Sequence, residues 1–279
     1  MTSASHYTRM RSRPGFTIIE LMISMMIGLI VLGAVYKLMI TQTSGYGKQR
    51  ELADVRETAR SGSTLLSRDL RHAASGGGAV VAMTPNSITL RSVRGVGIVC
   101  AKHPTLQRYG LARTAGKFEA GADDSAMVFQ IGRETWRRVK VSGVGTPAAM
   151  GVPACAWPGG RAPDVVIEIP ITTTAIKVGA PLRTFRRVQY TQYSIDGRWW
   201  LGRKIGAAAE FEQLTGPLRA SSGLSFAYFD TLGAPTAVPS AVGMVSFTLN
   251  AESYKKARLN SGEYAFQRDS LTTKVLLRR

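Results

Sequence analysis

The chain has 279 residues, of which 44% are apolar and 8% aromatic, and this composition excludes an intrinsically disordered protein. Its 36 Lys and Arg residues outnumber 18 Asp and Glu residues, so the formal net charge is +18. A field of this sign favours anionic partners such as nucleic acid, lipid headgroups or acidic protein surfaces. The alternative is a soluble basic surface matched to acidic neighbours in an assembly.

The N-terminal segment has the pattern of a membrane span. The first fifteen residues hold three arginines and no acid, and an uncharged run extends from Leu21 to Tyr36. Extending this run back to Phe16 gives a helix of about 31 Å, which matches the thickness of a bilayer core. The preceding arginines place the N-terminus in the cytoplasm, so everything after Lys37 is expected to be exported. A cleaved secretory signal would need a shorter apolar core and a small-x-small cleavage site, and no convincing site follows.

One carboxylate, Glu20, lies near the start of this apolar run. A charge in the bilayer interior costs on the order of 2.5–3.5 kcal/mol on insertion scales, and such residues usually have a partner. The stretch RPGFTIIELMI, from Arg13 to Ile23, resembles the prepilin signature of type IV pilins and type II secretion pseudopilins. That signature is a short basic leader, then Gly and Phe, with Glu as the fifth residue of the mature chain.

The resemblance implies a role for three residues. A prepilin peptidase would cleave between Gly15 and Phe16 on the cytoplasmic side, and the new Phe16 amine would be N-methylated. Glu20 would pair with the N-terminal amine of a neighbouring subunit, which offsets the cost of burying a lone carboxylate. The alternative is that Glu20 merely lies among headgroups at the cytoplasmic boundary.

The helix is expected to continue beyond the membrane segment. Apolar residues recur there in steps of three and four, which predicts an amphipathic helix. These positions are Leu52, Val55, Ala59, Gly62, Leu66, Leu70 and Ala73. The glycine-rich stretch SGGGAV at residues 75–80 ends the helix. We therefore expect one long helix whose first half faces lipid and whose second half packs on a globular body.

Alternating apolar residues beyond residue 78 predict β-strands. The predicted segments are 86–93, 125–132, 164–171, 223–230, 243–250 and 269–279, with a hairpin over 188–204 that turns at Asp196-Gly197. The Gly-, Pro- and Ala-rich segment 141–163 is predicted to be a loop.

One helix followed by many strands predicts an α+β fold, in which a long N-terminal helix packs on a mainly antiparallel β domain. We expect a leader at 1–15, a transmembrane and assembly helix at 16–40, its amphipathic continuation at 41–75, and a periplasmic β-rich globular domain at 76–279. This is also the pilin architecture that the resemblance implies.

The two cysteines, Cys100 and Cys155, are expected to form a disulfide if the globular domain is exported. Closing the loop between Cys100 and Cys155 would stabilise the fold by about 4 kcal/mol in the chain-entropy model. The alternative is two buried free thiols.

The C-terminal third, from Val188 to Arg279, loosely resembles pseudopilin J and the minor pilin W (PilW) group. The resemblance rests on a Tyr-rich strand, an Asp-Gly hairpin, the stretch LSFAYFDTLG and the chain end TTKVLLRR. It implies a PilW-type minor pilin that moves from the inner membrane to the pilus and cell surface and helps to initiate or support pilus assembly. Its partners would be the prepilin peptidase and other minor and major pilins, and its context would be twitching motility and cell adhesion. The alternative is a J-like pseudopilin of type II secretion. Residues 91–187 match no family.

The sequence holds no catalytic pattern. There is no His-x-x-x-His, Cys-x-x-Cys or Gly-x-Ser-x-Gly, so we expect no enzyme, cofactor or metal. Asp123 and Asp124 could bind calcium with help from neighbours, but a solvated turn is the preferred interpretation because EF-hand spacing is missing.

Basic and aromatic residues alternate in three clusters, RETWRRVK, RTFRRVQY and GRWWLGRK. Such mixtures hold single-stranded nucleic acid, so DNA is a candidate partner and a pilus-borne DNA-binding or surface-binding module is a further alternative. The candidate anion-binding residues are Arg133, Arg137, Arg138, Arg186, Arg187, Arg203 and Lys204. The structural explanation is that each strand buries its aromatic residue and exposes its arginines.

Overall fold

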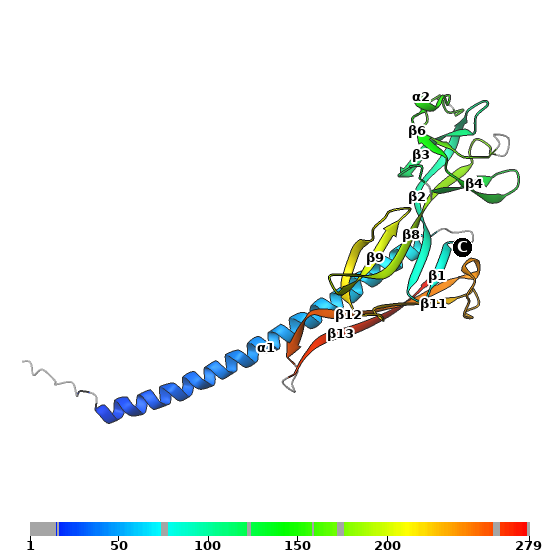
Figure 1. Ribbon diagram of the computed structural model, residues 1–279. Helices are drawn as coiled ribbons and strands as arrows, with labels where there is room; N and C mark the ends of the chain where they lie inside the picture. The colour runs from blue at the N-terminus through cyan, green and yellow to red at the C-terminus, as the bar shows by residue number, and fades with distance from the viewer. Residues whose placement is uncertain are drawn as a thin grey trace, which may run out of the picture.

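The computed structural model describes residues 15, 17–73, 78–121, 124–157, 159–171, 176–258 and 263–277. Its first element is the expected single helix, α1 (Ile18–Arg71), which spans 54 residues. Thr17 caps the helix by accepting a hydrogen bond from the Glu20 N–H at 3.3 Å. The first half of α1 projects away from the rest of the molecule, and its second half lies against a sheet (Figure 1).

The rest of the described chain is mainly one antiparallel sheet, which confirms the predicted α+β class. The strands are β1 (Val80–Thr84), β2 (Ser87–Lys102), β3 (Arg108–Gly116), β4 (Ser125–Gln130), β5 (Thr135–Lys140), β6 (Gly143–Gly145), β7 (Val165–Glu168), β8 (Pro181–Ile195), β9 (Arg198–Ile205), β10 (Glu212–Leu218), β11 (Leu224–Phe229), β12 (Met244–Arg258) and β13 (Tyr264–Leu276). Two short helices, α2 (Pro147–Met150) and the 3-10 helix η1 (Pro239–Ala241), lie between strands.

The strands follow the order β11-β12-β10-β9-β8-β2-β3-β7-β6. Three further pairings lie off this path: β1 pairs with β2, β13 pairs with β12, and β4 of the β4–β5 hairpin pairs with β8. The predicted hairpin is present as β8 and β9. Asp196 and Gly197, at its turn, have φ of 51° and 73°, the positive values that a tight two-residue hairpin turn of the primed kind requires.

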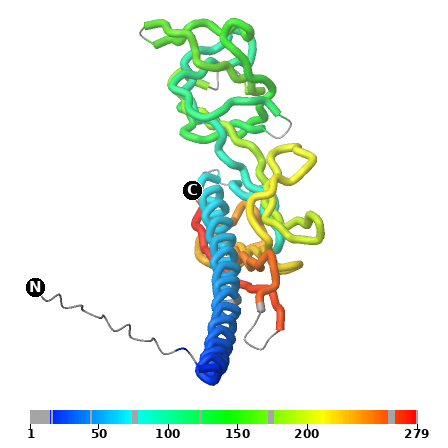
Figure 2. Tube along the Cα trace, turned by 90° about the vertical axis from the view of Figure 1, so that its left-hand side faces the viewer, coloured from blue at the N-terminus to red at the C-terminus, as the bar shows by residue number. Residues whose placement is uncertain are grey.

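The sheet carries two lobes, joined by the long strands β2 and β8. The proximal lobe contains α1, β1, β9–β13 and the adjoining halves of β2 and β8. The distal lobe comprises the described residues within 95–186 and lies beyond the C-terminal end of α1 (Figures 1 and 2). Each lobe has its own hydrophobic core: β2 gives Ile88 and Leu90 to the proximal core and Val99 to the distal one.

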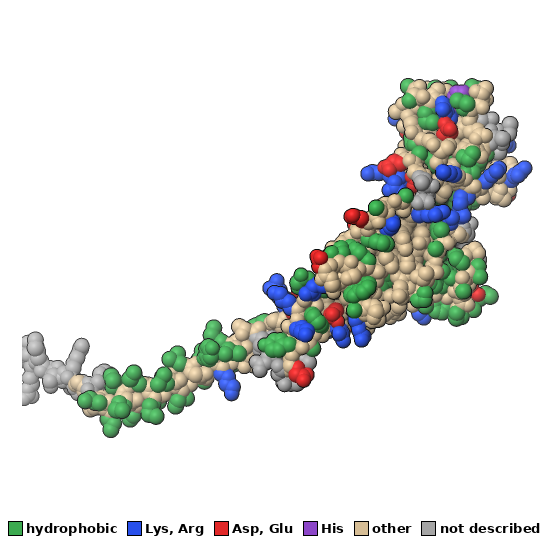
Figure 3. Space-filling view, in the orientation of Figure 1, with side chains coloured by type: hydrophobic (Ala, Val, Ile, Leu, Met, Phe, Trp, Pro, Cys, Tyr) green, Lys and Arg blue, Asp and Glu red, His purple; other side chains and the backbone are tan. Residues whose placement is uncertain are grey.

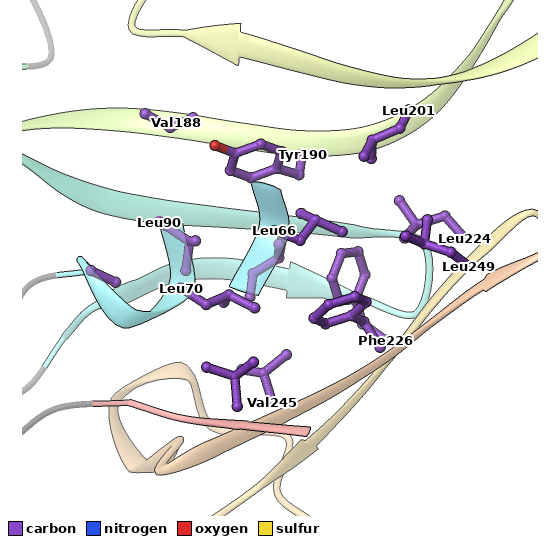
Figure 4. Close-up of a cluster of buried hydrophobic side chains, with 14 of the residues drawn as sticks. Leu66, Leu70, Leu90, Val188, Tyr190, Leu201, Leu224, Phe226, Val245 and Leu249 are labelled. Carbon is purple, nitrogen blue, oxygen red and sulfur yellow. The ribbon is translucent and has the colours of Figure 1, made fainter. Parts of the chain in front are cut away.

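The proximal core forms between α1 and the sheet. Leu66 and Leu70 of α1 are completely buried there, among side chains of β2, β11 and β12 (Figure 4). The apolar face predicted for residues 52–73 is thus the face that packs, except that Leu52 is only half-buried. Gly62 lies at a close approach: a Cβ there would come within 2.9 Å of both Leu249 Cδ1 and Thr215 Cγ2.

Five strands were not predicted, namely β1, β3, β5, β6 and β10. The segment predicted as one loop over 141–163 also contains β6 and α2. In β3 the four residues Tyr109–Ala112 are all buried, so that strand shows no alternation. β10 contains Gly216-Pro217 and its register shifts twice against β9, so neighbouring strands rather than a period-2 pattern define it.

Candidate functional site

The N-terminal end of α1 holds the residues singled out for processing and assembly. Gly15 is exposed, while Phe16 lies outside the described residues. Glu20 is exposed in the first helical turn, where the positive end of the helix dipole stabilises a negative charge. Ser24 Oγ donates to the Glu20 carbonyl oxygen at 2.6 Å. Within the part of the chain that the structure describes, the Glu20 carboxylate forms no ion pair.

The first half of α1 presents a mainly apolar surface. Large apolar side chains from Ile18 to Ile40 are exposed, and Figure 3 shows them covering the projecting part of the helix. α1 is long and apolar enough to cross a membrane. A surface of this size in contact with water would be unfavourable, so this part of the helix fits a lipid or protein environment.

The disulfide lies in the distal lobe. Cys100 of β2 and Cys155 are bonded, and both are buried. The Ala156 N–H donates to the Cys100 carbonyl oxygen at 2.8 Å, which aligns the two segments on either side of the bond. The predicted disulfide is therefore present, and it holds the segment after α2 against β2.

Arg203 and Arg186, two of the seven candidate anion-binding residues, form ion pairs with described carboxylates of the same chain. Arg203 Nη2 lies 2.8 Å from Glu212 Oε2, and its Nη1 lies 4.0 Å from Asp69 Oδ2 of α1. Arg186 Nη2 lies 3.1 Å from Glu119 Oε2. These arginines connect neighbouring elements, so an external anion would have to compete with these carboxylates.

Asp124 is not in a solvated turn, and that expectation was wrong for this residue. Its side chain is 5% exposed and faces two guanidinium groups, with Arg94 Nη1 and Arg186 Nε each 3.5 Å from its carboxylate oxygens. Arg94 also pairs with Glu119 and, through this hydrogen bond above all, lowers the pKa of that carboxyl group. Two arginines close to the carboxylate offset the cost of its burial. Asp123 lies outside the described residues.

The other candidate residues are spread over three strands and a turn. Arg133 lies in the β4–β5 turn, and Arg137 is exposed on β5. Lys204 lies over the Phe211 ring, 5.7 Å from its centroid. Arg138 and Arg187 instead line a common cavity with Arg91 and Lys140, two residues that were not predicted. The signal for these two is their position in the β-sheet register, which the sequence alone does not give.

Metal-ligating side chains do not cluster in the described part of the chain. No group of three or more His, Cys, Asp or Glu residues in those segments is placed to hold a metal ion.

Comparison with known proteins adds one finding to this geometry. Residues 10–36 match the family described as the prokaryotic N-terminal methylation motif. Neither a search of curated proteins nor a search of solved structures gave a match. The motif implies processing by a prepilin peptidase and assembly with other pilins, and pilin-type proteins are generally structural rather than enzymatic. Together with the exposed apolar half of α1, which fits anchoring in the inner membrane, the motif supports a type IV pilin-like protein.

Proposed function

We propose that this chain is a PilW-type minor pilin that helps to initiate or support assembly of a type IV pilus. It is inserted in the inner membrane with its N-terminus in the cytoplasm and its globular domain in the periplasm. It is then cleaved between Gly15 and Phe16, methylated at Phe16 and incorporated with other pilins. The observation that carries this proposal is the methylation motif over residues 10–36, which continues directly into the exposed apolar half of α1.

The continuity of α1 explains how assembly positions the globular domain. The exposed segment from Ile18 to Ile40 is available to lipid or to other pilin helices. The same helix then supplies Leu66 and Leu70 to the proximal core, where both are completely buried. The helix is thus part of the folded domain as well as an anchor, and packing of its first half fixes where the domain lies in the filament.

The position of Glu20 favours transfer of the helix from the lipid into the filament. The carboxylate is exposed on α1 and forms no ion pair with any described residue of its own chain. In lipid a charged carboxylate costs on the order of 2.5–3.5 kcal/mol. An ammonium group of a neighbouring subunit would offset this cost only after assembly. Glu20 thereby favours the assembled state over the isolated subunit.

The test is the full-length variant Glu20→Val in the native host. Insertion and cleavage are expected to be unchanged, while the number of pili falls strongly because the intersubunit pair is lost. The matched control is Glu57→Val, which removes an exposed carboxylate farther along the same helix and should leave piliation normal. Pili are counted by electron microscopy. Normal piliation in the Glu20→Val strain would contradict the pairing role.

A second variant, Gly15→Ala, tests processing. The chain is expected to stay in the membrane with residues 1–15 attached, and mass spectrometry of the N-terminus reads this directly. The wild-type chain should begin at a methylated Phe16. A wild-type chain in cells that still begins at Met1 would rule out the proposal. Loss of type II secretion rather than of pili in these strains would point to a J-like pseudopilin.

A further inference from the structure

A cavity lined by positive charge lies between the two lobes, near the C-terminal end of α1. Its volume is about 360 Å³. The lining residues are Arg91, Asp124, Ser125, Arg138, Val139, Lys140 and Arg187. Four of these side chains are cationic and one is a carboxylate. Lys and Arg side chains also gather at the junction of the lobes in the space-filling view (Figure 3).

The register of the sheet brings these charges together. Arg91 of β2 lies directly opposite Arg187 of β8 in the antiparallel pair. Arg138 and Lys140 are two residues apart on β5 and therefore lie on the same face of that strand. A Cβ on Gly78 would be 2.9 Å from Arg138 Nη2 and 3.3 Å from Arg91 Nη1, so both guanidinium groups lie close to Gly78.

Like charges lie close to one another in this arrangement. Like charges directly opposite each other on neighbouring strands are destabilising. Burial, followed by repulsion from Arg138 and Arg187, lowers the pKa of Arg91. Asp124, the carboxylate among the described lining residues, lies 3.5 Å from both Arg94 and Arg186. Convergence of several cationic side chains around a cavity is the arrangement expected of an anion-binding site.

We propose that this cavity binds a phosphate group, either as inorganic phosphate or as a phosphate monoester. A phosphate monoester carries a charge of about −1.5 to −2 and presents three strong acceptor oxygens. Guanidinium groups bind such oxygens with two parallel N–H donors, and several of them can share one phosphate. A single carboxylate would neutralise less of the charge and offers fewer acceptors. The cavity volume falls in the range of small-molecule sites, so it also has room for the organic part of an ester.

The position of the cavity excludes a lipid headgroup as the source of the phosphate. The apolar segment ends near Ile40, and α1 continues to Arg71. At 1.5 Å per residue this part of the helix is about 46 Å long. Ser92, which follows Arg91, forms a β-bridge with Ala73 just after the helix end. The cavity is therefore far from any membrane that holds the first half of α1. The site is separate from the assembly helix and goes beyond the proposed function.

Calorimetric titration of the purified full-length chain with inorganic phosphate, in a nonionic detergent at low salt, tests the proposal. Wild-type protein is expected to bind phosphate, and Arg138→Gln and Arg187→Gln are each expected to weaken binding by about tenfold or more, as for loss of a charged hydrogen bond. The matched control is Arg137→Gln, because Arg137 is the next residue on β5 and points to the opposite face. Its phosphate affinity should equal that of the wild type.

Thermal unfolding gives an independent measurement on the same proteins. Phosphate should raise the melting temperature of the wild type and of Arg137→Gln, but not that of the other two variants. No phosphate binding by the wild type, or equal binding by Arg138→Gln and Arg187→Gln, would overturn the proposal.

Two competitors identify the class of ligand. An oligonucleotide that binds and is displaced by inorganic phosphate would support the site with a nucleic acid as the phosphate source. A poly-glutamate peptide that binds to wild type while phosphate does not would overturn the proposal in favour of an acidic protein partner. These measurements use purified protein, so their result does not depend on whether the chain assembles into pili.

Discussion

The two lobes share one sheet, but among the described residues the apolar face of α1 packs on the proximal lobe. Val55, Ala59, Leu66 and Leu70 of the helix belong to the proximal core. The two larger distal clusters contain no helix residue and consist of strand and loop side chains, together with the disulfide cysteines. The chain enters the distal lobe along β2 and returns along β8 (Figures 1 and 2).

This difference separates two tasks. The proximal lobe is built on the helix that anchors and assembles the protein, so its stability is linked to the integrity of α1. The distal lobe is a long extension of the β2–β8 pair that the helix does not support, and it has a covalent bond instead. Changes in the distal lobe should therefore leave the assembly helix and its contacts intact, whereas changes in the proximal core should affect both.

The largest expected effect is loss of the disulfide in Cys100→Ser,Cys155→Ser. The bond closes a loop across a sequence separation of 55 residues. In the chain-entropy model such a loop contributes about 4 kcal/mol. The loss should appear as reduced hydrogen-exchange protection and faster proteolysis in residues 95–186, with protection of α1 unchanged. Equal loss of protection in α1 would show that the two lobes unfold as one unit.

A substitution in the proximal core should reduce stability mainly in the proximal lobe. Leu66→Ala removes a completely buried side chain between α1 and the sheet and should destabilise the protein by about 3 kcal/mol, within the range for such cavities. Leu65→Ala is the matched control, because Leu65, the preceding residue on the helix, is only half-buried. Its loss should destabilise the protein clearly less. Denaturant unfolding measures both. Hydrogen-exchange protection should fall in α1, β11 and β12. A loss of protection confined to the distal lobe would contradict the division of the molecule into two lobes.

The two lobes also differ in how far the sequence predicted them. The helix face with Val55, Leu66 and Leu70 and the alternating strands β11, β12 and β13 were predictable, because each buries one face against one layer. β3 was not, because Tyr109–Ala112 are buried on both faces and the strand loses its period-2 pattern. β5 was recognised only as a basic and aromatic cluster, since four of its six residues are exposed.

Candidate residues divide in the same way. Gly15, Phe16 and Glu20 form a local motif, so spacing along the chain was enough to single them out. The cavity depends on Arg91 lying opposite Arg187, two residues 96 positions apart that only strand pairing brings together. Arg186 and Arg203 show the reverse, because basic residues that look free in the sequence are paired with carboxylates from other elements.

The smallest expected effect concerns Tyr109, a completely buried tyrosine of the distal lobe whose hydroxyl donates to the Ile171 carbonyl oxygen at 2.8 Å. Burial raises the pKa of Tyr109 to about 12. A raised pKa means that the folded state favours the protonated hydroxyl. This contribution is complete below the ordinary tyrosine pKa of about 10 and is lost as the pH rises toward 12. At pH 11 the loss should be about 1 kcal/mol.

The variant Tyr109→Phe isolates this contribution. It lacks the hydroxyl and its hydrogen bond, so it should be less stable than the wild type at neutral pH by about 1 kcal/mol. The difference between the two proteins should be constant below pH 9 and should shrink above pH 10, because only the wild type must ionise Tyr109 on unfolding. Urea unfolding over this pH range measures it. A difference that stays constant up to pH 12 would show that Tyr109 ionises as readily in the folded distal lobe as in the unfolded chain, and that this lobe excludes water less well than its buried core implies.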